Sequence, residues 1–197
     1  PDFMVLWPKK SDEQLLIAKR LANESHELVT RDLLMASNLD LDPLVHTKSA
    51  ITMEDWIEEL SHRGIEQKLG VAPGDLRIRI DLADWLIYAC KEISRYDKGD
   101  DALLQQPRKQ LIELLDELRL RIINGCKPDL LELVSIRGVG RVRARHMAKY
   151  GVRTVDDVLE LTEKDQKRLA EEWGWSRQLV DGIMEKAGKV RRTRRRS

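Results

Sequence analysis

The sequence contains few of the residues that mark secreted, metal-binding or membrane proteins. Its two cysteines, Cys90 and Cys126, lie in neither a Cys-x-x-Cys pair nor a Cys/His ligand spacing. We therefore expect neither a disulfide framework nor a zinc site, and we predict a cytoplasmic, intracellular location. No apolar run is as long as a membrane-spanning helix and no signal-peptide pattern opens the chain, so no membrane partner is expected. Because the chain begins at Pro1, we expect a piece of a longer protein.

Aromatic residues and strand-like patterns are also scarce. Aromatic residues account for 5% of the chain and charged residues for 35%, a balance that favours helices with long charged faces over a β-sandwich. Apolar residues recur at helical spacing, and no segment alternates as a strand would. The clearest apolar stripe is formed by Leu111, Leu114, Leu115, Leu118 and Ile122. The sequence therefore predicts an all-α fold.

A nucleotide-binding motor is missing from the sequence as well. There is no Gly-x-x-x-x-Gly-Lys-Ser/Thr loop to cradle phosphates, and no strand–helix alternation of the kind that builds a RecA-like core. We therefore expect that this chain alone neither binds nor hydrolyses ATP. No catalytic residue, metal ligand or cofactor site is predicted in it.

Caps and helix breakers divide the chain into two predicted domains. A helical bundle is expected over residues 1–126. The segment Lys127-Pro128-Asp129 then marks a boundary, because proline is favoured at the first position of a helix. A small helical domain is expected over residues 127–188. Residues 189–197 would form a basic tail, which we expect to be disordered.

Several helix ends can be read from local signals. Ser61, Thr154 and Thr162 are each expected to begin a helix, Gly70 is expected to end one, and Trp56, among apolar neighbours, is expected to be buried. Residues 38–46, with Pro43, are expected to form a loop, and Thr52 is expected to open the next helix with a capping-box pattern. A long helix is predicted from Asp75 to Tyr96 and a last helix from Arg177 to Ala187. Thr30 or Asp32 would cap a short helix that runs through Met35.

The formal net charge of +1 conceals a strong asymmetry along the chain. Residues 136–153 carry six lysines and arginines and no acid, and residues 189–197 carry six more, which leaves −11 for the rest. Basic charge is thus concentrated toward the C-terminus, which suits a polyanionic partner there. For the tail, a disordered solubilising end is an equal alternative.

The most informative segment is a glycine turn between two predicted helices. Gly138 and Gly140 bracket Val139, so the backbone can take unusual dihedral angles and approach a ligand closely. A helix then begins near Arg141, and a helix N-terminus favours anions. We interpret the segment as a helix-hairpin-helix motif that binds nucleic-acid phosphates without reading base sequence. The predicted contacts are Arg137, Gly138, Val139, Gly140, Arg141, Arg143 and Arg145. The alternative is a tight turn with a solvated basic face.

A tryptophan on the long predicted helix is a candidate for contact with bases. On a helical wheel, Trp85 falls at the edge of the polar arc, and Arg77 lies two turns earlier on the same side. Arg79 falls inside the apolar arc. An exposed aromatic ring beside a cation can stack on an unpaired base of any sequence. The alternative, favoured by residue statistics alone, is that Trp85 packs against another helix of the bundle.

Four segments together resemble one known family. They are Asp55-Trp56-Ile57-Glu58-Glu59, Pro73-Gly74-Asp75-Leu76-Arg77, Ala83-Asp84-Trp85-Leu86 and the stretch from Leu130 to Arg145. In order and spacing they are similar to the C-terminal part of archaeal Hjm/HelQ-like DNA-repair helicases of superfamily 2. The resemblance implies that residues 1–126 form a ratchet domain, whose long helix lines the path of a translocating single strand. It also implies that residues 127–188 form a helix-hairpin-helix domain that grips the emerging strand.

The resemblance further implies a parent protein and its partners. The parent would be an ATP-dependent 3′→5′ DNA helicase that repairs stalled replication forks, with ATP and magnesium in motor domains outside this chain. Partners would be single-stranded or forked DNA, those motor domains, and replication or repair proteins near the nucleoid. In this family a Trp and an Arg on the ratchet helix stack on bases, and Trp85 matches the Trp. Ile78 occupies the Arg position, between Arg77 and Arg79, and the wheel favours Arg77.

Two other function classes fit parts of the sequence. Helix-hairpin-helix DNA glycosylases carry a catalytic Asp after the hairpin, where Asp156 and Asp157 lie, although both residues also suit the first turn of a helix. A helix-hairpin-helix module can also dock an acidic protein. Nothing in the residues reads a 2′-hydroxyl, so DNA is preferred over RNA on the resemblance alone.

Overall fold

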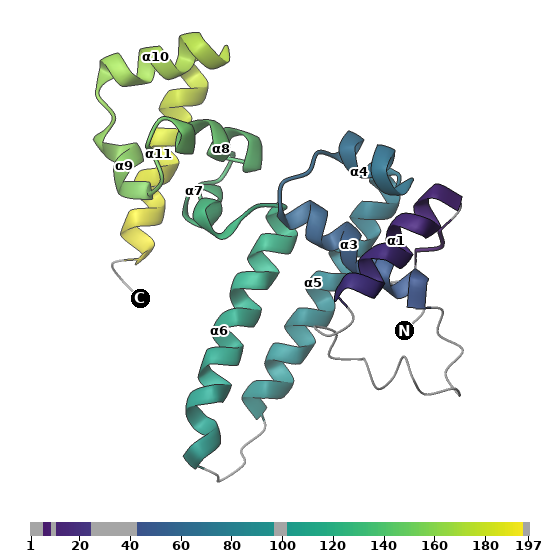
Figure 1. Cartoon of the computed structure of the whole chain (residues 1–197). Coiled ribbons are helices and arrows are strands. Elements are labelled where there is room, and N and C mark those ends of the chain that lie inside the picture. The colour runs from purple at the N-terminus through teal and green to yellow at the C-terminus, as the bar shows by residue number, and fades with distance from the viewer. Residues whose placement is uncertain (1–5, 9–10, 25–42, 97–101, 195–197) are drawn as a thin grey trace. The chain divides into compact units, whose positions relative to one another are not determined.

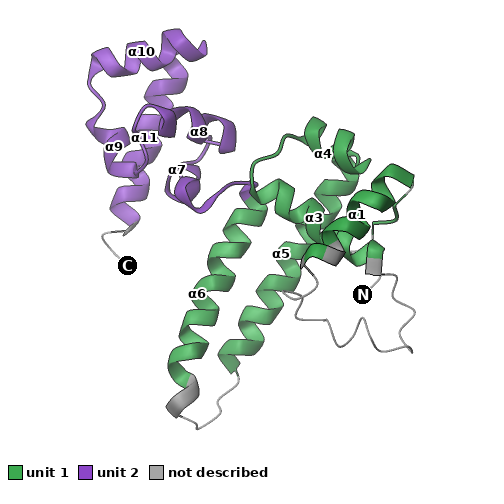
Figure 2. Cartoon of the chain, in the orientation of Figure 1, with its two compact units in different colours: residues 1–123 green, residues 124–197 purple. Residues whose placement is uncertain are grey.

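The structure is a computed structural model that describes residues 6–8, 11–24, 43–96 and 102–194. Over these residues it contains helices, turns and loops and no strand, so the predicted all-α fold is confirmed. The chain divides into two compact units, residues 1–123 (unit 1) and 124–197 (unit 2) (Figure 2). None of the described helices combines the length and the apolarity needed to cross a bilayer.

Unit 1 is a bundle built around two long helices. Its described elements are α1 (Ser11–Glu24), α3 (Pro43–Ile57), α4 (His62–Leu69), α5 (Pro73–Tyr96) and α6 (Ala102–Asn124) (Figure 1). Ile17, Ile65 and Leu69 are completely buried where α1, α3 and α4 pack together. Trp56 on α3 is also buried, as predicted, and its indole Nε1 donates a hydrogen bond to the Ile122 carbonyl at 2.7 Å. That bond ties α3 to the end of α6.

Local caps define the start of the long helix α5. The Ser61 hydroxyl accepts a hydrogen bond from the Gly64 N–H at 3.0 Å and begins α4. Gly70 ends α4 in the left-handed conformation, with φ of 60°, as its predicted role requires. The chain then turns directly into α5, which begins at Pro73, slightly before the expected Asp75. Proline suits this first position because the N–H it lacks would have no helical partner.

Two expectations for the middle of unit 1 are wrong. Helix α3 begins at Pro43, so residues 43–46 are helical rather than part of a loop. Thr52 does not open a helix but lies within α3, completely buried, and its hydroxyl donates to the Lys48 carbonyl at 2.8 Å. The same Thr side chain can cap a helix or bond back to the carbonyl four residues earlier, so the capping-box pattern misled the interpretation. The short helix expected through Met35 lies outside the described residues.

Helices α5 and α6 lie side by side and antiparallel, joined by charged side chains. Lys91 of α5 forms an ion pair with Asp116 of α6, and Arg119 of α6 forms one with Asp84 of α5. The Arg119 guanidinium carbon also lies 5.3 Å from the centroid of the Tyr88 ring. These ion pairs hold one side of α5 against α6, while Leu76, Ile80 and Ala83 of α5 are buried in the core of unit 1.

Unit 2 is a smaller helical unit with its own core. Its elements are η2 (Pro128–Leu130), α7 (Leu131–Val134), α8 (Arg141–Lys149), α9 (Val155–Glu160), α10 (Glu163–Trp173) and α11 (Arg177–Arg194). Leu130, Leu133 and Ile136 are completely buried before the glycine turn, and Ala144 is completely buried after it. Thr154 and Thr162 begin α9 and α10 with full capping boxes, as the sequence predicts for the two threonines.

The last helix is longer than predicted. Helix α11 continues through Arg194, so residues 189–194, expected to be a disordered tail, are helical. Three contacts explain the difference. Val190 packs against the core, Arg191 forms an ion pair with Asp156 at 3.1 Å, and Lys189 pairs with Glu185 one turn earlier. Gly188 does not stop the helix, because packing on either side of it outweighs the weak helix propensity of glycine.

Candidate nucleic-acid interface

The glycine turn in unit 2 is anchored by the residue between its glycines. The Val139 side chain is 3% exposed within the core, and its N–H donates to the Ile136 carbonyl at 2.9 Å. Gly138 has a φ of +94°, which a side chain would strain, and Gly140 is extended. Both glycines are exposed. Val139 therefore positions the turn, and the two glycines are the parts of its backbone that meet solvent.

Helix α8 begins at this turn without a side-chain cap. Gly140 is its N-cap residue, and although the Gly140 carbonyl accepts from the Ala144 N–H at 3.0 Å, glycine has no side chain to accept from the N–H groups before it. Those groups also have no acceptor within the helix. A Cβ placed on Gly140 would meet nothing within 4 Å, so the approach to the turn is open. The partial positive charge of the helix start faces this opening and favours an anion.

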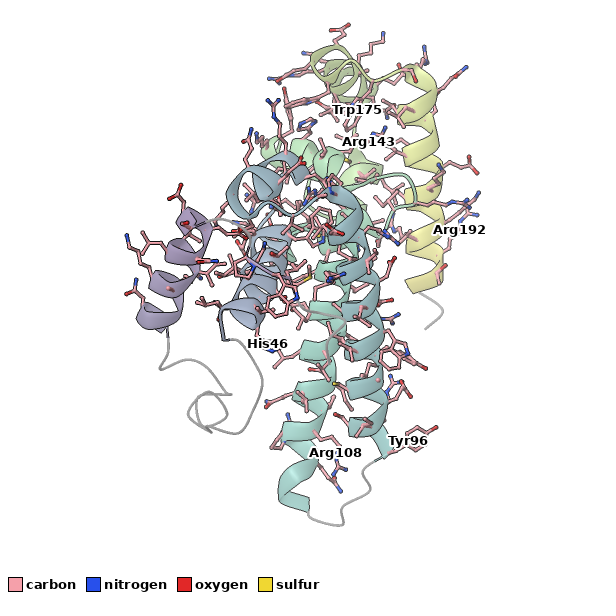
Figure 3. All side chains as sticks on the ribbon, turned by 90° about the vertical axis from the view of Figure 1, so that its right-hand side faces the viewer. His46, Tyr96, Arg108, Arg143, Trp175 and Arg192 are labelled. Atoms are coloured by element: carbon pink, nitrogen blue, oxygen red, sulfur yellow. The ribbon has the colours of Figure 1, made fainter. Side chains whose placement is uncertain are left out.

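The predicted arginines of α8 lie around the turn, but each already contacts the protein. Arg145 pairs with Asp129, with nitrogen–oxygen distances of 2.7 and 2.9 Å. Arg141 donates to the Gly125 carbonyl at 3.1 Å, and Arg143 donates to the Gly138 carbonyl at 2.7 Å. The three guanidinium groups therefore give the turn positive charge and also hold it in shape. Arg143 is labelled on α8 in Figure 3.

Two further cations at the turn differ from the arginines of α8. Arg137, a predicted contact, is exposed next to Gly138. Lys186 of α11 was not predicted, yet its Nζ lies 3.5 Å from the point where a Cβ on Gly138 would stand. The sequence offered no signal for Lys186, because only the packing of α11 brings it to the turn.

Trp85 is exposed on α5. Its side chain is 60% exposed, and it makes no ring contact or hydrogen bond with the described residues. Packing inside the bundle, the alternative for Trp85, is therefore wrong for unit 1. Ile78, Tyr88, Ile93 and Tyr96 are also exposed on this helix, and Tyr96 is labelled near its end in Figure 3. An indole ring exposed in this way has a face available for stacking.

The structure does not place the predicted arginines on the Trp85 ring. Arg77 is exposed and pairs with Asp81 at 2.8 Å, one turn further along the helix. Arg79 is half-buried. A cation beside this part of α5 comes instead from α6, where Arg119 forms an ion pair with Asp84 and lies over the Tyr88 ring. Sequence reasoning missed Arg119 because its position depends on the pairing of α5 with α6.

The two acids proposed for glycosylase chemistry serve other purposes. The carboxylate of Asp157 accepts hydrogen bonds from the N–H groups of Arg153 and Thr154 at 2.8 and 2.9 Å. These two backbone hydrogen bonds, of which the one from Arg153 has the larger effect, hold the pKa of Asp157 below its usual value. Asp156 forms the ion pair with Arg191. Among the described residues, no three His, Cys, Asp or Glu side chains gather as metal ligands would. Nothing in this geometry favours base excision.

Comparisons with known proteins place the chain among archaeal helicases. The family described as archaeal helicase, domain 4, matches residues 1–125. The ATP-dependent DNA helicase Hel308 of Thermoplasma acidophilum is 37% identical over 140 residues, which cover 71% of this chain and 19% of that protein. The Methanococcus vannielii protein of the same name is 30% identical over 156 residues, or 79% of this chain and 20% of that protein.

A third relative agrees with the first two. The Hel308 helicase of Thermococcus kodakarensis is 33% identical over 145 residues, which cover 74% of this chain and 12% of that protein. The chain thus spans a fifth or less of the length of these relatives. The resemblance noted from the sequence is confirmed, and the chain belongs to the archaeal helicase domain 4 family.

Proposed function

We propose that this chain is the part of an ATP-dependent DNA helicase that engages single-stranded DNA. The observation that carries the proposal is the exposed Trp85 on α5. Helix α6 holds this part of α5 in place, because Asp84 and Lys91 of α5 both form ion pairs with α6. A tryptophan that is 60% exposed has a large apolar surface that an unpaired base can cover. Stacking of this kind contributes about 1–3 kcal/mol per base and tolerates any sequence.

The helix that carries Trp85 also offers positive charge to the strand. Arg77 is exposed two turns before Trp85, and its pair with Asp81 is solvent-exposed and therefore weak. We propose that Arg77 contacts the strand beside the stacked base, and that half-buried Arg79 contributes charge from the flank. Arg119 would keep Asp84 and Tyr88 in place while a base rests on Trp85.

The glycine turn would hold the strand by its phosphates. The N–H groups at the start of α8 and the exposed Arg137 face solvent, where an oxygen of the backbone can reach them. The proposed phosphate contacts are Arg137, Gly138, Gly140, Arg141, Arg143 and Arg145, with Val139 positioning the turn. Such contacts give affinity and register without selecting a base sequence, as a helicase substrate requires.

In the parent enzyme these contacts would work with a motor that this chain does not contain. Relatives named as ATP-dependent DNA helicases are several times longer, so ATP and magnesium would bind elsewhere in the protein. Stacking on Trp85 would hold the strand while the motor domains change state, and translocation would run 3′→5′. Stalled replication forks are the proposed substrate, following the family resemblance.

Fluorescence anisotropy on labelled DNA tests this proposal directly. We expect tighter binding to a mixed-sequence single strand than to the matched duplex, with affinity falling as salt rises. Trp85→Ala should weaken single-strand binding roughly 5-fold to 150-fold, the equivalent of about 1–3 kcal/mol for one lost base stack. Ile93→Ala, at a similarly exposed site on the same helix, is the control and should bind as the parent chain does. Equal binding of duplex and single strand would contradict the proposal.

A further inference from the structure

Lys186 brings a positive charge to the glycine turn from the far end of the chain. Among the described residues, and leaving aside the two chain neighbours of Gly138, its ammonium nitrogen is the only atom within 4 Å of the position that a Cβ on Gly138 would occupy. Gly138 lies before α8, whereas Lys186 lies in α11, so the approach is a product of the fold. Lys186 therefore adds a side-chain cation at the edge of the turn, besides the exposed Arg137.

Packing of α11 determines where Lys186 lies. Ile183 and Ala187, on either side of it in the helix, are 4% and 0% exposed within the core of unit 2. Lys186 itself is half-buried. A lysine in this setting covers apolar surface with its methylene stem and keeps its charged end at the surface. The ammonium group is thus held near Gly138 by the helix rather than by a carboxylate.

Lys186 interacts with the neighbouring Glu185 only through its Coulombic field, whereas Glu185 forms its hydrogen bond with Lys189. On the same helix Lys189 pairs with Glu185 at 2.6 Å and Arg191 pairs with Asp156 at 3.1 Å. Lys186 makes no ion pair or hydrogen bond with any described residue. The three arginines of α8 all donate to protein acceptors, namely Asp129 and the carbonyls of Gly125 and Gly138.

We propose that Lys186 neutralises a nucleic-acid phosphate at the glycine turn, alongside the exposed Arg137 and ahead of the arginines of α8. The inference rests on the proposed function, in which this turn contacts the DNA backbone. A phosphate oxygen beside Gly138 would meet an ammonium group that donates to no described acceptor, whereas the α8 arginines would first have to give up theirs. Lysine suits this role because its charge is a point on a flexible stem that follows a moving strand without a fixed geometry.

The test compares two lysines one turn apart on α11. Lys186→Gln should weaken single-strand binding several-fold at low salt and reduce the slope of log K against log salt by about 0.7, the value for one phosphate on a single strand. Lys189→Gln is the matched control, because Lys189 is exposed and already paired with Glu185, and it should leave the slope unchanged. Lys186→Arg keeps the charge and should restore most of the slope. Thermal melting of each variant shows that the fold is retained.

A second measurement separates this inference from the proposed function. Inorganic phosphate is titrated into the chain while the amide resonances of Gly138 and Gly140 are followed by NMR. We expect phosphate to shift both resonances in the parent chain and in Lys189→Gln, and to shift them much less in Lys186→Gln. If the variants bind DNA equally, with equal salt slopes, the role of Lys186 is overturned and DNA binding by the chain stands. If phosphate acts through Lys186 but no strand binds, the proposed function fails instead. Equal phosphate shifts in all variants overturn the inference.

Discussion

Arg145 and Asp129 form a bidentate ion pair that links the start of unit 2 to helix α8. The guanidinium nitrogens lie 2.7 and 2.9 Å from the two carboxylate oxygens. The hydrogen bond from Arg145 is the main reason why the pKa of Asp129 lies below its usual value. An arginine that the sequence marks for DNA is thus also part of the structure that shapes the turn.

This ion pair predicts a stability effect in acid. The carboxylate's pKa is lowered in the folded state, so the pair stabilises the fold above the ordinary pKa of 3.8 and loses its effect as pH falls through the lower, folded value. Asp129→Asn should lower the melting temperature at neutral pH, and the gap to the parent chain should begin to narrow below pH 3.8 and close once the pH is below the folded-state pKa. The pair is partly exposed, so we expect it to contribute less than about 1 kcal/mol to the free energy of unfolding. A gap that persists unchanged in strong acid would contradict this account.

His146 predicts a second, separate pH effect. Its ring stacks on Trp173, with centroids 3.6 Å apart, and burial lowers its pKa, with a further contribution from the charge of Lys149. The unfolded chain therefore binds a proton more readily than the folded one. The free energy of unfolding should therefore be unaffected by His146 above about pH 6.5 and should decrease as the pH drops below that value. His146→Phe keeps a stacked ring without a titrating group, so the melting temperature of this variant should depend less on pH between pH 5 and 7 than that of the parent chain. A parent chain that melts equally at both pH values would rule this out.

The hydrogen bond from Trp56 to Ile122 predicts a cost in stability without a cost in DNA contact. Trp56→Phe leaves a buried carbonyl without its donor, which costs about 1–3 kcal/mol. Urea unfolding measures the change, and Trp7→Phe, at a side chain that is 65% exposed, should stay within about 0.5 kcal/mol of the parent. DNA affinity of folded Trp56→Phe should equal that of the parent chain. A large loss of affinity would mean that Trp56 contributes to the interface.

Two glycine substitutions should change stability in opposite directions. Gly138→Ala places a side chain at φ of +94° and should destabilise the chain by about 1–3 kcal/mol through backbone strain. Gly188→Ala lies within α11, where a Cβ meets nothing within 4 Å, and should stabilise it by about 0.5–1 kcal/mol. Denaturant unfolding of both variants checks the signs. If Gly138→Ala were as stable as the parent, the turn would not depend on its left-handed residue.

Local signals in the sequence predicted the parts of the fold that depend on neighbouring residues. Ser61, Thr154 and Thr162 cap the helices they were expected to cap, and Trp56 is buried among apolar neighbours. The glycine turn followed from the same reasoning, because a glycine pair between apolar helices constrains the backbone locally. Thr52 shows the limit of such signals, since a buried hydroxyl within a helix and a capping hydroxyl share one pattern.

The contacts that the sequence did not predict join residues far apart in the chain. Arg119 reaches Asp84 and Lys186 reaches the turn only because two helices pack at a particular register. Neither residue differs in type or local pattern from other cations in a chain that is 35% charged. The end of α11 was missed for the same reason, because Arg191 finds Asp156 through tertiary packing.

The most direct test of the central claim combines Trp85→Ala with a strand that has no bases. Anisotropy gives the affinity of the parent chain and of the variant for a normal single strand and for an otherwise identical strand whose sites are abasic. If Trp85 stacks on a base, the substitution should cost about 1–3 kcal/mol on the normal strand and almost nothing on the abasic strand. Equal losses on both strands, or no loss on either, would contradict the claim that Trp85 holds DNA by its bases.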